Sequence, residues 1–158
     1  MKTLTLMIGI SGSGKSTYVN DNFPDHQLIS SDDITETIGG EFITTWAFFN
    51  SKERYRDISV YDAVSKTICE ANMKRGRAIV IDDLNIDKEK IKNWVDLADK
   101  YNYQKHAVLI HESLSTCMTR RNDMPFGILT GMYNQFTGLI SDDEFLKIFD
   151  KCLKIYRG

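Results

Sequence analysis

Short apolar runs alternate with longer amphipathic segments along most of the chain. The runs have the length and β-branched content of buried strands, whereas the segments between them repeat apolar residues at helical spacing. This alternation is typical of an α/β fold with a mainly parallel sheet and helices on both faces. Four strands are predicted, and a fifth could lie in a segment that is assigned here to another element. The four predicted strands cover residues 3–9, 26–30, 78–81 and 105–111.

The amphipathic segments predict the helices between the strands. The longest places Tyr61, Val64 and Ile68 on one face, and Asp87 is a suitable N-cap after the third strand. The aromatic-rich stretch 41–50 predicts a helix or an ordered insertion. No repeat or linker interrupts the pattern, so residues 1–158 are expected to form a single domain. The predicted helices cover 15–22, 34–38, 55–75, 87–101, a segment from Ser113 or Ser115 to Arg121, 128–136, and a final helix that opens at Ser141.

The first strand runs into a loop, Gly9-Ile-Ser-Gly-Ser-Gly-Lys-Ser-Thr17, that fits the G-x-x-x-x-G-K-[ST] pattern of phosphate-binding loops. Its glycines allow positive φ and a close approach of the backbone to phosphate oxygens. A glycine-rich turn with a surface lysine is the simpler interpretation, but a strand before the loop and a helix after it favour a nucleoside-triphosphate site. The residues expected to bind the nucleotide are Gly9, Ser11, Gly12, Ser13, Gly14, Lys15, Ser16 and Thr17.

Two residues of this loop carry the expected chemistry. The Lys15 ammonium would lie between the β- and γ-phosphates and act in catalysis, and the Ser16 hydroxyl can hold Mg²⁺. ATP and Mg²⁺ are therefore the expected cofactors.

Polar clusters follow two further strands. In a parallel sheet, ligands bind beyond the carboxyl ends of the strands. Asp32, with Asp33 in reserve, could accept the proton of an attacking hydroxyl, although both could simply cap the next helix. Asp82 or Asp83 could hold Mg²⁺ through water or contact the acceptor. Asn85 could bind the acceptor or cap a turn.

Phosphoryl transfer also requires positive charge near the migrating group. Arg120 and Arg121 lie near a helix end before Pro125, in a position similar to a lid. The alternative is that both are solvated surface arginines.

The composition restricts the expected partners, metals and cellular location but does not indicate a function. The formal net charge of −2 gives no overall signal for nucleic acid, so such a partner would be held by local basic groups. Cys69, Cys117 and Cys152 have no metal or redox spacing, which predicts reduced thiols and no structural metal. No signal-peptide pattern or membrane-length apolar run is present, so a cytoplasmic protein without membrane contact is expected.

Together these features resemble the kinase domain of phage-type polynucleotide 5′-hydroxyl kinases, from the first strand to about Tyr133. The resemblance implies a P-loop kinase fold with four or five strands. Its more specific parts are Ser31-Asp32-Asp33, Ile81-Asp-Asp-Leu-Asn85, the helix with Trp94 that ends in Ala98-Asp-Lys-Tyr101, and then Arg121-Asn122 and Met124-Pro125 ahead of Leu129 and Met132-Tyr133.

The resemblance also implies residue roles. Asp32 matches the family's general base, Asp83 matches the aspartate that positions the acceptor, and Arg121 is the lid candidate for catalysis. Asp33 and Asn85 are further candidates for substrate binding. The chain departs from the family in two places: Thr35 stands where the family has an arginine that contacts the acceptor's phosphate, and the lid segment is shorter.

The acceptor expected from the resemblance is a hydroxyl of nucleic acid, with DNA favoured over RNA. A polynucleotide 5′-hydroxyl is narrowly favoured. Some phage relatives phosphorylate the hydroxymethyl group of a modified pyrimidine such as 5-hydroxymethyluracil in DNA, which is the first alternative. The second is a kinase of a nucleoside, nucleotide or sugar, because the loop is also similar to those of several metabolite kinases. The third is a nucleotide-binding module without phosphoryl transfer.

Overall fold

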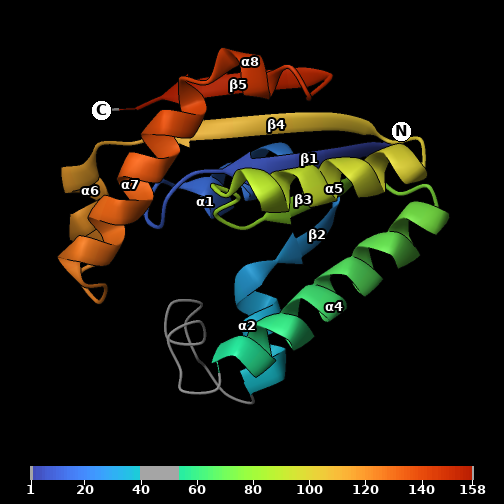
Figure 1. The fold of residues 1–158 in the computed structure, drawn as a ribbon, viewed down its shortest axis with the longest axis horizontal. Coiled ribbons are helices and arrows are strands. Elements are labelled where there is room, and N and C mark those ends of the chain that lie inside the picture. The colour runs from blue at the N-terminus through green and yellow to red at the C-terminus, as the bar shows by residue number, and fades with distance from the viewer. Residues whose placement is uncertain (1, 40–53, 158) are drawn as a thin grey trace.

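The computed structural model describes residues 2–39 and 54–157 (Figure 1). Its five strands form one all-parallel sheet in the order β2-β3-β1-β4-β5. The predicted α/β fold is confirmed, whereas the prediction for 41–50 lies outside the described residues. The strands are β1 (Thr3–Ile8), β2 (Gln27–Ser30), β3 (Ile79–Asp82), β4 (Gln104–His111) and β5 (Lys151–Tyr156). The described helices are α1 (Lys15–Asn22), α2 (Ser31–Gly39), α4 (Arg54–Lys74), α5 (Lys88–Lys100), α6 (Leu114–Arg120), α7 (Phe126–Ile140) and α8 (Asp143–Leu146).

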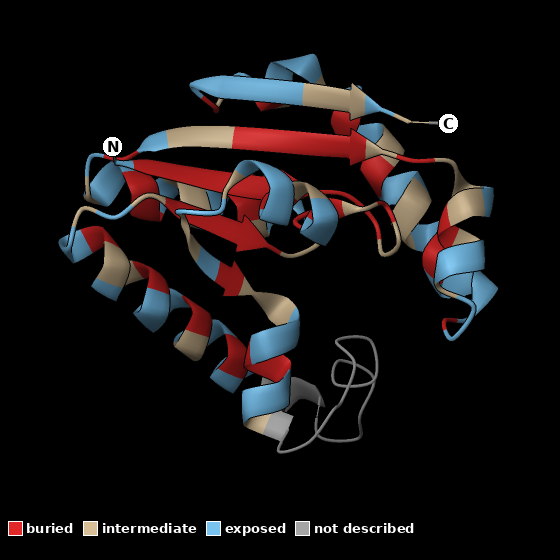
Figure 2. Ribbon diagram, turned by 180° about the vertical axis from the view of Figure 1, so that it is seen from behind, coloured by how far each residue is buried: buried red, intermediate tan, exposed pale blue. Residues whose placement is uncertain are grey.

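Helices cover both faces of the sheet, as predicted, but unequally. Every residue of the central strand β1 is buried, because β3 and β4 flank it and helices pack above and below (Figure 2). Alternate side chains of β1 point to opposite faces. Leu4, Leu6 and Ile8 join the larger apolar cluster, which includes residues of α4, α5 and α7. Met7 joins a smaller cluster with Val19 of α1.

Two segments near the C-terminus differ from the prediction. The helix that was expected to open at Ser141 is capped by Asp142, whose side chain accepts a hydrogen bond from the Phe145 amide, and it ends at Leu146. The chain then forms β5, the fifth of the described strands, and among these strands β5 pairs with β4 alone. Because β5 is an edge strand, its apolar side chains stay partly exposed, with Leu153 at 49%. Its apolar pattern is therefore weak.

Helix α2 also begins earlier than expected, at Ser31 instead of Ile34. Asp32 and Asp33 consequently lie in its first turn, where the helix dipole favours negative charge. None of the described helices is long and apolar enough to cross a membrane.

The parallel arrangement brings all five carboxyl strand ends to one edge of the sheet, on the left in Figure 1. The glycine-rich loop follows the central strand β1, and the polar clusters after β2 and β3 lie on one side of it. The segments that follow β4 and β5 lie on the other side. This edge is where the predicted site residues meet.

Candidate active site

The loop between β1 and α1 has the geometry of a phosphate-binding loop. Gly12 and Gly14 have φ of 83° and 93°, in the left-handed region that disfavours other residues. The prediction of positive φ is wrong for Gly9, whose φ is not in this region. Gly9 is instead required for space, since a Cβ there would lie 2.8 Å from the Ser13 Oγ and 3.1 Å from the Ile110 carbonyl oxygen.

The loop's lysine is buried and held by the loop itself. Lys15 Nζ donates a hydrogen bond to the Ile10 carbonyl at 3.0 Å. Burial lowers the pKa of Lys15, and the nearby charges of Asp82 and Asp83 oppose this shift. An ammonium group in this position is surrounded by loop backbone and carboxylates, which suits binding to a phosphate oxygen.

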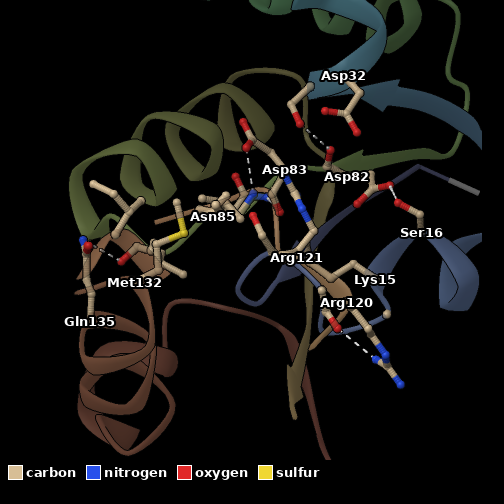
Figure 3. A pocket seen from close by; sticks show the side chains of 18 of the residues that line it. Lys15, Ser16, Asp32, Asp82, Asp83, Asn85, Arg120, Arg121, Met132 and Gln135 are labelled. Carbon is tan, nitrogen blue, oxygen red and sulfur yellow. Dashed lines mark hydrogen bonds between the residues drawn. The ribbon is translucent and has the colours of Figure 1, made fainter. Parts of the chain in front are cut away.

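Ser16 and Asp82 form a pair of oxygen ligands beside the loop. The Ser16 Oγ donates to Asp82 Oδ2 at 2.7 Å (Figure 3). Asp82 is the last residue of β3 and lies between Ser30 of β2 and Met7 of β1 in the sheet register. Burial raises the pKa of Asp82, while the Ser16 hydrogen bond and the Lys15 charge act to lower it. A hydroxyl and a carboxylate at this spacing fit the hard oxygen ligands that Mg²⁺ prefers.

The two aspartates after β2 are placed differently. Asp32 lines the cleft and lies across from Asp82 (Figure 3). Asp33 is exposed on the first turn of α2 and is outside the set of residues that line this cleft. The structure therefore brings only Asp32 of this pair to the other predicted site residues.

The loop after β3 is fixed by contacts that the sequence did not predict. Asp83 accepts hydrogen bonds from the Tyr61 hydroxyl and from the Leu84 amide, both at 2.7 Å. Burial, followed by the charge of Asp83, raises the pKa of the Tyr61 hydroxyl far above its ordinary value, so Tyr61 remains a donor. Asn85 is buried with φ 50°, and its amide donates to the Met7 carbonyl at 2.7 Å. These contacts join the loop after β3 to α4 and β1.

Both predicted arginines line the cleft, with different partners. Arg120 donates to the Gly12 carbonyl at 2.8 Å and lies 3.7 Å from the buried carboxylate of Glu112. Arg121 forms two hydrogen bonds with Asp123, at 3.0 and 3.1 Å. Arg120 thus touches the phosphate-binding loop directly, and Glu112 orients it. Sequence analysis did not single out Glu112.

A third arginine was missed because β5 was missed. Arg157 follows β5, and its amide donates to the His111 carbonyl at 2.7 Å. A Cβ placed on Gly14 would lie 2.7 Å from one Arg157 guanidinium nitrogen and 4.0 Å from an Arg120 guanidinium nitrogen. Arg157 also lines the cleft. Two guanidinium groups therefore flank the N-terminus of α1, where phosphates bind.

Most of the predicted site residues line one cavity of about 970 Å³, whereas Gly9, Ser13 and Asp33 do not (Figure 3). At one end are the phosphate-binding loop, Arg120 and Arg157, and in the middle are the carboxylates. This volume lies at the upper end of the range for ligand pockets, which suits a site for two substrates. The arrangement can place a triphosphate beside a carboxylate and leave room for a second molecule.

Known proteins resemble this chain in sequence and in fold. The AAA_33 family, described as an AAA domain, matches residues 4–123. A curated protein of Autographa californica nuclear polyhedrosis virus, named "Putative bifunctional polynucleotide kinase/RNA ligase", is 30% identical over 124 residues. The matched region covers 75% of this chain and only 18% of that protein.

Two solved structures show how widely the fold is shared. A chain of the Pnkp1/Rnl/Hen1 RNA repair complex has a TM-score of 0.71 at 14% identity, over 94% of this chain and 46% of that one. Shikimate kinase from Acinetobacter baumannii has a TM-score of 0.58 at 14% identity, over 99% of this chain and 85% of that one. Identities this low establish the fold alone. Because the family model matches more than half of this chain, the chain belongs to the AAA_33 family; it has a P-loop kinase-like fold and is distantly related to polynucleotide kinases.

Proposed function

We propose that this kinase transfers the γ-phosphoryl group of ATP to a hydroxyl of nucleic acid, with a polynucleotide 5′-hydroxyl as the preferred acceptor and DNA favoured over RNA. One observation carries the proposal. Carboxylates from two neighbouring strand ends, Asp32 and Asp82–Asp83, share a cavity with a phosphate-binding loop. The distant relationship to polynucleotide kinases supports nucleic acid as the acceptor class.

The transfer step follows from the placement of these groups. Lys15 and the loop amides hold the β- and γ-phosphates. The acceptor oxygen attacks the γ-phosphorus, its proton passes to the Asp32 carboxylate, and the bond between the γ-phosphorus and the β–γ bridging oxygen breaks to release ADP. Arg121 and Arg120 neutralise the negative charge that develops on the transferring group. Asp83, oriented by Tyr61, positions the acceptor.

Ser16 and Asp82 would hold Mg²⁺, Ser16 directly and Asp82 through water. When bound, the metal supplies positive charge to the phosphate oxygens of ATP. Asp83 is less suited to this role, because both of its oxygens already accept hydrogen bonds.

A second cavity supports an acceptor that is larger than a single nucleotide. It has a volume of about 450 Å³ and lies between α4 and α5. Asp83 and Lys90 line both cavities, so the two spaces adjoin at the proposed acceptor site. Trp94 and Lys66 also line the second cavity, although carboxylates share its wall. An aromatic ring and lysines beside the reaction centre suit the bases and phosphates of a continuing strand.

One observation favours the hydroxymethyl group of a modified pyrimidine in DNA as an alternative acceptor. Thr35, which stands where the related kinases have an acceptor-binding arginine, is fully buried and donates to the Asp32 carbonyl at 3.0 Å. Its side chain supports the α2 turn and does not line the main cavity. The acceptor's phosphate therefore lacks this contact, which a 5′-end kinase would use and a base kinase would not need.

The test is transfer of labelled phosphate from ATP to a matched set of acceptors. The set contains 5′-hydroxyl DNA and RNA oligonucleotides, 5-hydroxymethyluracil DNA with blocked 5′-ends, nucleosides, nucleotides and sugars. Labelling of the 5′-hydroxyl DNA is expected. Labelling of only the modified DNA would replace the preferred acceptor with the alternative, and turnover of only the small molecules would overturn the proposal. ATP binding without transfer to any acceptor would identify a nucleotide-binding module.

A further inference from the structure

Four exposed basic side chains gather at the edge of the sheet that is opposite the cleft. They come from the start of the chain and from the turn between α4 and β3, which lie close together on the right in Figure 1. A Cβ placed on Gly76, in this turn, would lie 3.8 Å from the Lys2 Cε, so the Lys2 side chain reaches the turn. The four residues, called the basic corner below, are Lys2, Lys74, Arg75 and Arg77.

Hydrogen bonds fix the backbone of this turn. Gly76 has a φ of 69°, and its amide donates to the Met73 carbonyl at 3.0 Å, which ends α4. The Arg77 amide donates to the Asn72 carbonyl at 3.2 Å, and the Arg77 carbonyl accepts a hydrogen bond from the Tyr103 hydroxyl at 2.7 Å. The turn is therefore anchored both to α4 and to the residue before β4.

The basic corner lacks ion pairs with the carboxylates that the structure describes. None of its four side chains lies within 4.0 Å of one of them, and Arg77 donates instead to the neutral Gln27 side chain at 3.3 Å. Many cations elsewhere are neutralised by a nearby carboxylate. These paired cations are Lys66, Lys88, Lys100, Lys105, Arg120, Arg121, Lys147 and Lys154.

The carboxylates of the adjoining segments leave most of this positive charge in place. Glu70, the last carboxylate of α4, already accepts a hydrogen bond from the Tyr101 hydroxyl and lies within 3.9 Å of Lys66 and Lys100. Asp25, in the turn before β2, is on the same edge of the sheet and opposes one of the four charges at most. Since the whole chain has a net charge of −2, the corner is a local concentration of positive charge.

The helix dipole does not account for the whole corner. It favours cations at the C-terminal end of α4, where Lys74 and Arg75 lie, but Lys2 and Arg77 are outside the helix. A cluster of unneutralised cations attracts a polyanion. The fork of donors on an arginine side chain also matches the oxygens of a phosphate group. This chemistry favours the phosphates of a nucleic acid as the occupant.

The corner is within reach of a strand whose 5′-end is in the cleft. Tyr61 of α4 donates to Asp83 at the proposed acceptor site. At about 1.5 Å per residue, Lys74 lies about 20 Å farther along the same helix. A base-stacked strand rises about 3.4 Å per nucleotide, so about six nucleotides span this distance. The second cavity, with Lys66 on its wall, lies beside α4 between these two points.

We infer that the basic corner is a second binding site for the acceptor polynucleotide, and that it contacts phosphates about six or more nucleotides from the reacting hydroxyl. This inference rests on the proposed transfer to nucleic acid. Contacts to phosphates do not read the base sequence, so the corner raises the affinity for long acceptors of any sequence. Because the corner lies at the opposite edge of the sheet, it leaves ATP binding and the chemical step unchanged.

The first test compares 5′-hydroxyl DNA strands of about 3 and about 15 nucleotides that begin with the same three nucleotides. At low salt the longer strand is expected to have a KM lower by about tenfold, with the same kcat and the same KM for ATP. Equal KM values would overturn the inference and leave the proposed function intact. If only hydroxymethyluracil DNA is labelled, the same comparison of lengths applies to it. Labelling of no nucleic acid would defeat the proposed function and this inference with it.

The second test removes the positive charge of the turn. In the triple variant Lys74→Gln, Arg75→Gln and Arg77→Gln, the KM for the long strand should rise close to that for the short strand, which should keep its value. Each lost phosphate contact reduces the salt dependence of binding to a single strand by about 0.7 in the slope of log K against log salt, so the slope should fall by about 2. The matched control removes the same charge outside the basic corner, with Lys147→Gln, Lys151→Gln and Lys154→Gln.

Two further measurements separate binding from folding. Urea denaturation and binding of a fluorescent ATP analogue check that both triple variants are folded. A turn with a structural role alone would alter stability and leave the preference for long strands as it is. If the variant of the turn kept both the preference for long strands and the salt dependence, the inference would be overturned, and an acidic protein surface would replace nucleic acid as the candidate occupant.

Discussion

The donor half and the acceptor half of the cleft are built in opposite ways. The donor half is mainly one continuous segment, residues 9–17, whose shape depends on the φ angles of its own glycines. The acceptor half combines Asp32 from the first turn of α2, Asp83 from the loop after β3 and side chains of α7. A continuous loop keeps its geometry in many proteins, whereas a composite surface changes whenever one helix is altered. This difference explains why one fold serves kinases with unrelated acceptors.

The largest effect should come from the acceptor half. Asp32→Asn is expected to lower kcat by about 10²–10⁴-fold, because the attacking hydroxyl loses its proton acceptor. The affinity for ATP should stay the same, since the phosphate-binding loop is untouched. Kinetics with labelled ATP measure kcat, which depends on the acceptor half. Direct binding of nucleotide measures the ATP affinity, which depends on the donor half. Glu36→Gln, on the exposed side of the same helix, is the control, and retained turnover in Asp32→Asn would rule out its role as the base.

The hydrogen bond from Asn85 to the Met7 carbonyl joins the two halves, and its removal should lower the stability of the fold. Asn85→Ala removes the buried hydrogen bond to Met7 and places alanine at positive φ, so the free energy of unfolding should fall by about 1–3 kcal/mol. Asn85→Gly keeps the backbone conformation and isolates the hydrogen bond. Urea denaturation measures both, with the exposed Asn93→Ala as control. If Asn85→Ala were as stable as the control, the two halves would not depend on this bond.

The donor half should be weakened selectively by Arg157→Ala. We expect the KM for ATP to rise about tenfold, because a guanidinium beside Gly14 is lost, while the KM for the acceptor is unchanged. Lys151→Ala, an exposed cation at the other end of β5, is the matched control. An increase in the KM for the acceptor instead would place Arg157 in the acceptor half and contradict the separation of the cleft into a donor half and an acceptor half.

The smallest effect concerns pH. Because burial raises the pKa of Asp82, this carboxylate takes up a proton at a higher pH than an exposed aspartate does. As the pH falls through that raised pKa, Asp82 loses the charge that would hold Mg²⁺, so the Mg²⁺ concentration needed for half-maximal activity should rise. Titrations of Mg²⁺ between pH 5 and 8 would measure this. In the Asp82→Asn variant the Mg²⁺ concentration needed for half-maximal activity should be high at every pH. If this variant had the same pH dependence as the unaltered protein, Asp82 would be excluded from the metal site.

The two halves also differed in how well they could be predicted. The phosphate-binding loop is a local motif, and the fold confirmed its strand, loop and helix. Strand β5 has a weak pattern because it is an edge strand with half-exposed apolar residues, so Arg157 could not be placed. Tyr61 was expected on the apolar face of its helix, but nothing in its spacing indicates that its hydroxyl reaches Asp83, 22 residues away.

The sequence by itself determined the alternation of strands and helices, the phosphate-binding loop and the carboxylates at two strand ends. These features depend on periodicity, on glycine conformations and on residues adjacent in the chain. Only the tertiary structure decided that Asp32 rather than Asp33 lines the cleft, that Arg157 flanks Gly14, and that side chains of α7 line the cleft. The physical reason is that the order of parallel strands and the packing of helices decide which distant side chains meet, and local pattern does not specify either.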